Sequence, residues 1–334
     1  MSHQTIRHAS HAGSWYQDSA PELSRQLDNW LAQVPEGLHS PARAVIVPHA
    51  GYQYCASCAA YAYRQVDPNL SHVVQAMIIM QCCRKRVFIV GPSHYARLTG
   101  CALSQAKLYQ TPFYNLTIDQ TSVQRVISVR LMDAAVYGEL YATEMFESMS
   151  LMADEDEHSL EMQLPFIAKV MSGHNFTIVP IMVGSLTPEK EASYGALLSR
   201  YLADPSNLFV ISSDFCHWGA RFHYQYYDKS WGDIHQAIQK LDEMAMKIIE
   251  DLSPTGFVSY LKKYSNTICG RHPIGILLNE CRFYGNWQFT ASRWTGNGHK
   301  MSIKFLNYAQ SNQCMNMQDS SVSYASAALT FHPV

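Results

Sequence analysis

Apolar residues recur at helical spacing in several stretches of the chain, and short apolar runs separate these stretches. The helical spacing predicts amphipathic helices, and bounded apolar runs predict buried strands. Helices are predicted over residues 20–34, 55–66, 188–202 and 234–252, and strands over residues 45–47, 87–90, 176–183, 208–211 and 302–306.

The order of these elements predicts the fold class. Strands that alternate with helices are typical of an α/β protein in which helices cover the sheet. The branched apolar residues in the runs favour parallel strands. No linker rich in Gly, Ser or Pro and no internal repeat divides the sequence. We therefore expect an α/β fold with a single domain, residues 1–334, built on a central, mostly parallel or mixed sheet layered between helices.

Three of the predicted strands end close to a histidine. These histidines are His49, His94 and His217, and Asp214 precedes the last of them. In an open α/β sheet, the residues just beyond the carboxyl ends of the strands form the site. Neighbouring strands would therefore bring these four side chains together. Since imidazole and carboxylate groups are metal ligands, the pattern predicts a metal site at the strand ends.

The pattern leaves the metal and the chemistry open. Neutral imidazoles suit iron, copper and zinc, and two histidines with one carboxylate are typical of non-haem iron(II). A zinc-bound water beside a histidine or aspartate base would instead give hydrolysis. The carboxylate of Asp214 could be a ligand or could fix the tautomer of a histidine. Spacing along the chain does not choose between these alternatives.

Composition and charge narrow the classes of partner. The chain is 47% hydrophobic and 16% charged, which is ordinary for a globular protein. A formal net charge of -2, with no basic patch beyond residues 84–86, argues against nucleic-acid binding. The longest apolar stretch, Val73–Cys83, contains two glutamines and is too short to cross a bilayer. We expect neither nucleic-acid binding nor membrane insertion.

The cysteines bear on the cellular compartment. The nine cysteines are scattered, and no charged segment followed by an apolar core marks a signal peptide. Without a secretory signal they are expected to be reduced thiols. Cys55 and Cys58 form a CxxC without a second pair, which favours buried structural residues over a zinc site. We expect the protein either in the cytoplasm alone or in both the cytoplasm and the nucleus.

The remaining candidates have ordinary structural interpretations. His158 follows an acidic run that is typical of a solvated helix start, although the pattern leaves open that His158 turns inward to the site. Arg271 could contact an anion, because its guanidinium matches carboxylates and phosphates, or could be structural. Trp15, Tyr16 and Tyr52 lie near the first strand end in the sequence and are predicted to be core or pocket-wall residues.

Several motifs run in order from about Ala9 to the C-terminus. They are residues 11–16, 47–52, 91–94, 154–159, 212–219, 269–273 and 307–310. Taken together, these motifs resemble those of the Memo family. Memo proteins mediate cell motility downstream of ErbB-type receptor tyrosine kinases, and their fold is similar to that of class III extradiol dioxygenases.

The resemblance implies a particular set of ligands. It implies that His49, His94 and Cys314 bind copper or iron, with Asp214 and His217 in the same pocket as supporting groups or proton carriers. The dioxygenases have a glutamate as third ligand, and a thiolate shifts the preference toward softer ions. By this resemblance we expect one-electron redox chemistry rather than ring cleavage.

The resemblance also implies partners. Phosphorylated tails of receptor tyrosine kinases, or their adaptors, would bind in a pocket that includes Trp15, Tyr16, Tyr52, His158 and Arg271. Two alternatives stay open: a catalytically inactive phosphopeptide-binding adaptor on an enzyme fold, and a zinc metallohydrolase. Three segments look longer than or unlike those of typical members, namely residues 71–84, 121–135 and 281–297.

Overall fold

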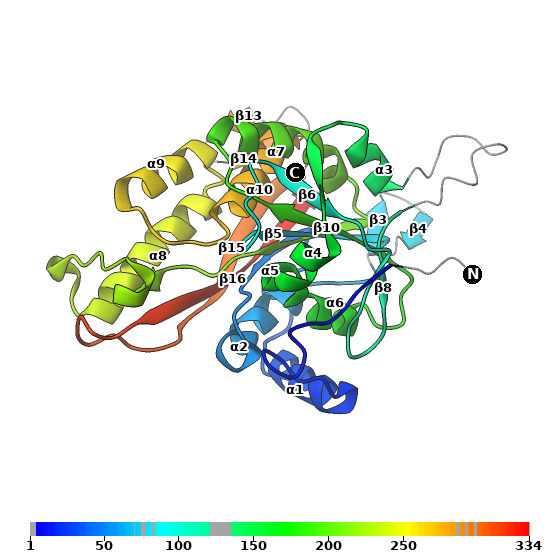
Figure 1. Cartoon of the computed structure of the whole chain (residues 1–334). Coiled ribbons are helices and arrows are strands. Elements are labelled where there is room, and N and C mark those ends of the chain that lie inside the picture. Colours follow the sequence, from blue (N-terminus) through cyan, green and yellow to red (C-terminus); the bar gives the residue numbers. More distant parts are fainter. Residues whose placement is uncertain are drawn as a thin grey trace.

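The chain folds around one large mixed β-sheet. The computed structural model describes residues 5–69, 71–74, 78–81, 84–120, 135–284, 288–290, 293–296 and 299–333. Among these residues the sheet has 11 strands, in the order β13-β14-β15-β16-β2-β11-β5-β10-β6-β9, with β12 (His217–Trp218) paired to β16. Figure 1 shows α1 and α2 below this sheet and α7 and α10 above it.

Four parallel strands form the centre of the sheet. They are β2 (Ala44–Val47), β11 (Asn207–Ser212), β5 (Arg86–Pro92) and β10 (Thr177–Val183), paired in that order. Nearly every residue in them is buried, because helices cover both faces of a parallel sheet. The apolar runs therefore predicted these strands, and the α/β class with a mixed sheet between helices is confirmed.

Further strands extend the sheet on both sides, mostly through antiparallel pairs. On one side β16 (Ser321–Pro333) pairs with β2 and with β15 (His299–Gln310). β16 is rich in Ser and Ala, so its pairing with β2, rather than its local pattern, makes it a strand. Further strands are β14 (Arg293–Gly296) and β13 (Gln288–Thr290) on this side, and β6 (Cys101–Ser104) and β9 (Phe146–Met149) on the other.

Several helices begin at a capping side chain or at a proline. Thr187 accepts a hydrogen bond from the backbone N–H of Lys190 and precedes Pro188, so α7 begins at this point. The helices are α1 (Ala20–Ala32), α2 (Tyr52–Tyr63), α3 (Val136–Tyr141), α4 (Leu151–Asp156), α5 (His158–Glu161), α6 (Leu164–Val170), α7 (Pro188–Ala203), α8 (Ile234–Glu250), α9 (Pro254–Tyr264) and α10 (Arg271–Phe283). No helix among the described residues has the length and apolar character needed to cross a membrane.

Smaller elements complete the fold. β1 (Ile6–Arg7), β7 (Leu108–Tyr109) and β8 (Leu116–Thr117) form a separate sheet of three strands. Two short 3-10 helices, η2 (Ala220–Phe222) and η3 (Lys229–Trp231), follow β12.

The three atypical segments differ in what the structure describes. Residues 121–134 lie outside the described residues. The segment 71–84 contains β3 (Ser71–Val74) and β4 (Ile78–Gln81), which pair with each other in a two-stranded sheet of their own. The segment 281–297 includes the end of α10 together with β13 and β14.

Candidate metal centre

His49 follows β2 at its carboxyl end and is 2% exposed. Its backbone N–H donates to Oδ1 of Asp214 at 2.8 Å, and its ring Nδ1 lies 2.7 Å from Oγ of Ser212. Burial, together with the nearby His94, lowers the pKa of His49 well below its usual value. The imidazole is therefore neutral, which is the form that binds metals.

His94 lies in the loop after β5 and is oriented by Glu157. The backbone N–H of His94 donates to one carboxylate oxygen at 2.6 Å, and its ring Nδ1 lies 2.9 Å from the other. Burial opposes ionisation of Glu157, but the hydrogen bond and charge of His94 outweigh it and lower the pKa of Glu157 to about 2. The carboxylate keeps the proton of His94 on Nδ1, so Nε2 is free to bind a ligand.

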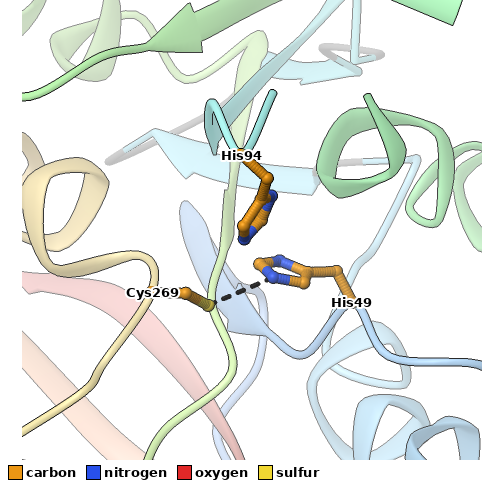
Figure 2. A group of neighbouring side chains, drawn as sticks. All are labelled: His49, His94 and Cys269. Atoms are coloured by element: carbon orange, nitrogen blue, oxygen red, sulfur yellow. Dashed lines mark hydrogen bonds between the residues drawn. The ribbon is translucent and has the colours of Figure 1, made fainter. Parts of the chain in front are cut away.

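Cys269 completes the cluster from a third segment of the chain. Its Sγ lies 3.1 Å from Nε2 of His49, and the backbone N–H of Asp214 donates to the same sulfur at 3.1 Å. Figure 2 shows this thiol and the two imidazoles directed toward one another. Burial, with the charge of Asp214, raises the pKa of the thiol well above its usual value.

The donor atoms of His49, His94 and Cys269 all lie within 4.8 Å of one another. Two imidazole nitrogens and a sulfur suit soft and borderline ions such as copper, iron and zinc. The side chain of His94 is 29% exposed, so the cluster is open to solvent on that side. The residues therefore fit a bound transition metal.

A second group of ligand atoms, from His94, Glu157 and His158, also lies within 4.8 Å. Both oxygens of Glu157 already accept hydrogen bonds, from His94 and from the backbone N–H of Ser159. The first cluster is the better candidate because its Nε2 and sulfur atoms face one another.

His158 lies inside the site rather than on a solvated helix start. It is 8% exposed, and its ring stacks on that of His94 at 4.4 Å between centroids. The ring of Trp15 lies 4.6 Å from the ring of His158. Burial and the neighbouring His94 lower the pKa of His158 to about 4. Glu157 and His158 are buried in the site, so the prediction of a solvated helix start is wrong for them, whereas Asp156 of the acidic run is exposed.

Asp214 and His217 lie beside the cluster, but their side chains are not among the three whose donor atoms lie within 4.8 Å of one another. The carboxylate of Asp214 accepts a hydrogen bond from the backbone N–H of His49 through Oδ1, so it positions that residue. Ring Nδ1 of His217 lies 2.9 Å from the carbonyl of Phe215, which can only accept, so this nitrogen carries the proton. Nε2 of His217 is then the nitrogen able to accept a proton.

Comparison with known proteins identifies the family. A family model described as "Memo-like protein" matches residues 7–328. The chain belongs to the Memo family. It is 54% identical to the human protein named "Protein MEMO1" over 99% of this chain and 100% of that one. It is 53% identical to the Danio rerio protein of the same name over the same shares, and 44% identical to "Protein memo-1 homolog" of Caenorhabditis elegans, over 98% of this chain and 83% of the other.

In this Memo-family chain, the cysteine whose sulfur lies beside His49 and His94 is Cys269, whereas the resemblance implied Cys314. Cys314 is buried in the loop between β15 and β16, where its carbonyl accepts a hydrogen bond from the N–H of His235. This loop precedes β16, which starts at Ser321 but pairs with β2 only from Ala327 onward. The hairpin of β15 and β16 therefore extends past the end of β2 and carries Cys314 with it. No strand pattern precedes Cys269, although it begins one of the motifs.

The predicted pocket residues are only partly together in the Memo-family fold. Tyr16 donates from its hydroxyl to Glu161, and Tyr52 donates to the carbonyl of Met162, both at 2.8 Å. Both tyrosines are buried, so they support the site from the core and do not line an open pocket. Arg271 follows the Cys269-Gly270 pair and donates to the carbonyl of Ile268 at 3.3 Å.

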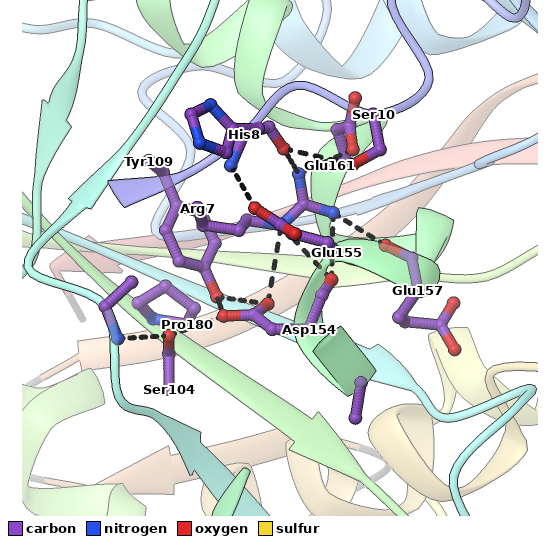
Figure 3. A network of polar contacts seen from close by, with 12 residues as sticks. Arg7, His8, Ser10, Ser104, Tyr109, Asp154, Glu155, Glu157, Glu161 and Pro180 are labelled. Carbon is purple, nitrogen blue, oxygen red and sulfur yellow. Dashed lines mark hydrogen bonds and ion pairs between the residues drawn. The ribbon is translucent and has the colours of Figure 1, made fainter. Parts of the chain in front are cut away.

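A buried ionic network holds the N-terminal segment of the fold against the site. Arg7 is completely buried and lies 2.5 Å from Glu161 and 3.4 Å from Asp154 (Figure 3). Glu161 also binds ring Nδ1 of His11 at 2.8 Å. Burial opposes ionisation of Glu161, but His11 and Arg7 outweigh it and lower the pKa of Glu161 to about 2. The network thereby positions the segment that carries Trp15.

Proposed function

We propose that this Memo-family chain binds copper or iron through His49, His94 and Cys269. Its function is a redox-linked role in the regulation of cell motility and receptor tyrosine kinase signalling. The observation that supports the metal site is the convergence of three donor atoms within 4.8 Å, from the ends of β2 and β5 and the start of α10.

The donor set favours particular metals. A sulfur ligand and two imidazoles favour copper(I) and iron(II) over hard ions such as magnesium or calcium. When bound, either metal would supply one-electron transfer. The chain contributes the orientation of the two histidines, through Ser212 and Glu157. It also provides Nε2 of His217 as a proton acceptor beside the cluster.

The metal content of the purified protein tests this function. We compare the wild type with a His49→Ala/His94→Ala/Cys269→Ala variant after expression with copper, iron and zinc. The matched control is Cys314→Ala, which removes a buried thiol outside the cluster. We expect copper or iron in the wild type and control and its loss from the triple variant. Equal copper and iron in all three would refute the proposal, and zinc alone would favour a metallohydrolase.

We also propose that phosphorylated receptor tails, or their adaptors, bind over the open side of this site. Tyr95, at the rim of the site, is 62% exposed, and its ring lies 6.1 Å from the ring of His158. The ring of Trp15 also lies next to His158. An aromatic rim of this kind can bury a peptide side chain. Arg271, which is half-buried beside Cys269, supplies a guanidinium for an anion.

Calorimetry with phosphorylated and unphosphorylated receptor peptides tests this second proposal. We expect the phosphorylated peptide to bind the wild type more tightly and Tyr95→Ala to weaken it. The absence of binding at high micromolar concentration for both peptides would rule out direct recognition. Peptide binding by a wild type that contains no metal would identify an inactive adaptor on an enzyme fold.

A further inference from the structure

The hydroxyl of Ser212 contacts three other buried polar groups. Its Oγ lies 2.7 Å from Nδ1 of His49 and 2.7 Å from the carbonyl oxygen of Ser159. The side-chain amide of Gln163 donates to the same oxygen at 3.0 Å. All of these residues are 2% exposed or less.

The direction of each hydrogen bond follows from the available protons. The carbonyl of Ser159 can only accept, so the single hydroxyl proton of Ser212 is directed to it. The amide of Gln163 cannot be flipped, because its nitrogen lies 3.1 Å from the carbonyl of Pro48 and its oxygen accepts from the hydroxyl of Tyr63. Oγ of Ser212 therefore has no proton left for His49 and can only accept from it.

The proton of neutral His49 must then reside on Nδ1, and the lone pair on Nε2. Nε2 is the nitrogen that lies 3.1 Å from Sγ of Cys269. Turning the hydroxyl of Ser212 toward His49 instead would leave the buried carbonyl of Ser159 without its donor, which is unfavourable. The hydrogen-bond network thus selects one tautomer of the ring.

We propose that Ser212 is a positioning residue that holds His49 in the Nδ1–H tautomer and so presents its Nε2 lone pair to the cluster. The role of this tautomer in metal binding rests on the proposed function. The arrangement is an uncharged counterpart of the carboxylate that orients His94. Carboxylates and carbonyls commonly orient ligating histidines in this way.

Ser159 connects the two arrangements. Its backbone N–H donates to Glu157 at 2.8 Å, and its carbonyl accepts from Ser212. Its own hydroxyl donates to the carbonyl of Pro92 at 2.7 Å, which fixes α5 against the end of β5. One residue therefore supports the partners of both His49 and His94.

The test is long-range proton–nitrogen NMR on metal-free protein labelled with 15N-histidine, with the His49 signals assigned by their loss in His49→Gln. We expect the wild type to carry the His49 proton on Nδ1. We expect Ser212→Ala to populate the Nε2–H form, and Ser212→Thr, which keeps the hydroxyl, to restore Nδ1–H. A wild type with the proton on Nε2, a result that needs no variant to fold, would overturn the proposal. So would an unchanged tautomer in Ser212→Ala.

Metal affinity provides a second readout. We expect Ser212→Ala to weaken copper(I) binding about 10- to 100-fold, as is typical when the partner of a ligating histidine is removed. Ser104→Ala is the matched control, because Ser104 is also a buried serine with a short hydrogen bond, to Asp154. A loss of equal size in this control would overturn the role of Ser212 in binding. A wild type that binds no metal would refute the proposed function while leaving the tautomer result intact.

Discussion

The sulfur of Cys269 lies 3.1 Å from Nε2 of His49, although the two residues are 220 positions apart in the chain. The contact exists because the loop before α10 lies against the end of β11, next to the end of β2. It decides which of the cysteines faces the two histidines, and with that the chemical character of the site.

Replacing Cys269 by alanine should weaken copper(I) binding by more than the roughly 10- to 100-fold that loss of an outer partner causes. The reason is that a sulfur donor is lost from a set of three. Competition with a chromophoric chelator measures the affinity. Cys314→Ala should retain wild-type affinity. If Cys314→Ala weakened copper(I) binding and Cys269→Ala did not, the cluster of His49, His94 and Cys269 would not be the metal site.

Gly270 holds the loop of Cys269 close to β11. A Cβ at this position would lie 2.3 Å from Cβ of Ser213 and 2.5 Å from the carbonyl oxygen of Ser212. Gly270→Ala should therefore lower the free energy of unfolding by about 1–3 kcal/mol and displace the thiol. Thermal unfolding and copper titration measure the two effects.

The control for Gly270 is Gly138→Ala in α3, where a Cβ meets nothing within 4 Å. Alanine there should be neutral or stabilising by about 0.5–1 kcal/mol, since it is the better helix former. If Gly270→Ala were as stable as this control and bound copper normally, the loop would not need the close approach.

Glu280 in α10 should make stability depend on pH. It is completely buried, and neither carboxyl oxygen has a hydrogen-bond partner among the described residues. Burial raises its pKa to about 8. Between the ordinary carboxyl pKa and this value, the folded chain holds a proton that the unfolded chain has released. The contribution of Glu280 should thus fall by roughly 1.4 kcal/mol per pH unit through this range.

Glu280→Met removes this contribution. The difference in free energy of unfolding between variant and wild type should grow in favour of the variant from pH 5 to pH 8, and chemical denaturation at each pH measures it. Glu243→Met, at an exposed position of α8, should show no such trend. Parallel stability curves for Glu280→Met and the wild type would contradict the prediction.

Arg7→Met should lower the free energy of unfolding by about 3–5 kcal/mol, because Glu161 and Asp154 would stay buried without their cation. Denaturant titration measures the loss. Arg25→Met is the control, since Arg25 pairs with Glu22 on the surface and should contribute at most about 1 kcal/mol. A similar small effect for both substitutions would mean that the buried network is not needed for folding.

Local pattern predicted the parallel centre of the sheet and the two histidines that follow β2 and β5. Four buried strands require near-continuous branched apolar runs, and such runs are visible in the sequence without any knowledge of the fold. The position of His49 and His94 at carboxyl strand ends then follows from the geometry of a parallel sheet.

Only the tertiary structure determined the third donor and the support of the site. Cys269 follows no strand, His158 follows an acidic run typical of solvent, and Ser212 is one small polar residue at the end of an apolar strand. Their places depend on close approaches between distant segments, such as Gly270 against β11 and Ser159 against Ser212. Periodicity reports which face of an element is buried, whereas the packing of one element on another decides which polar groups meet there.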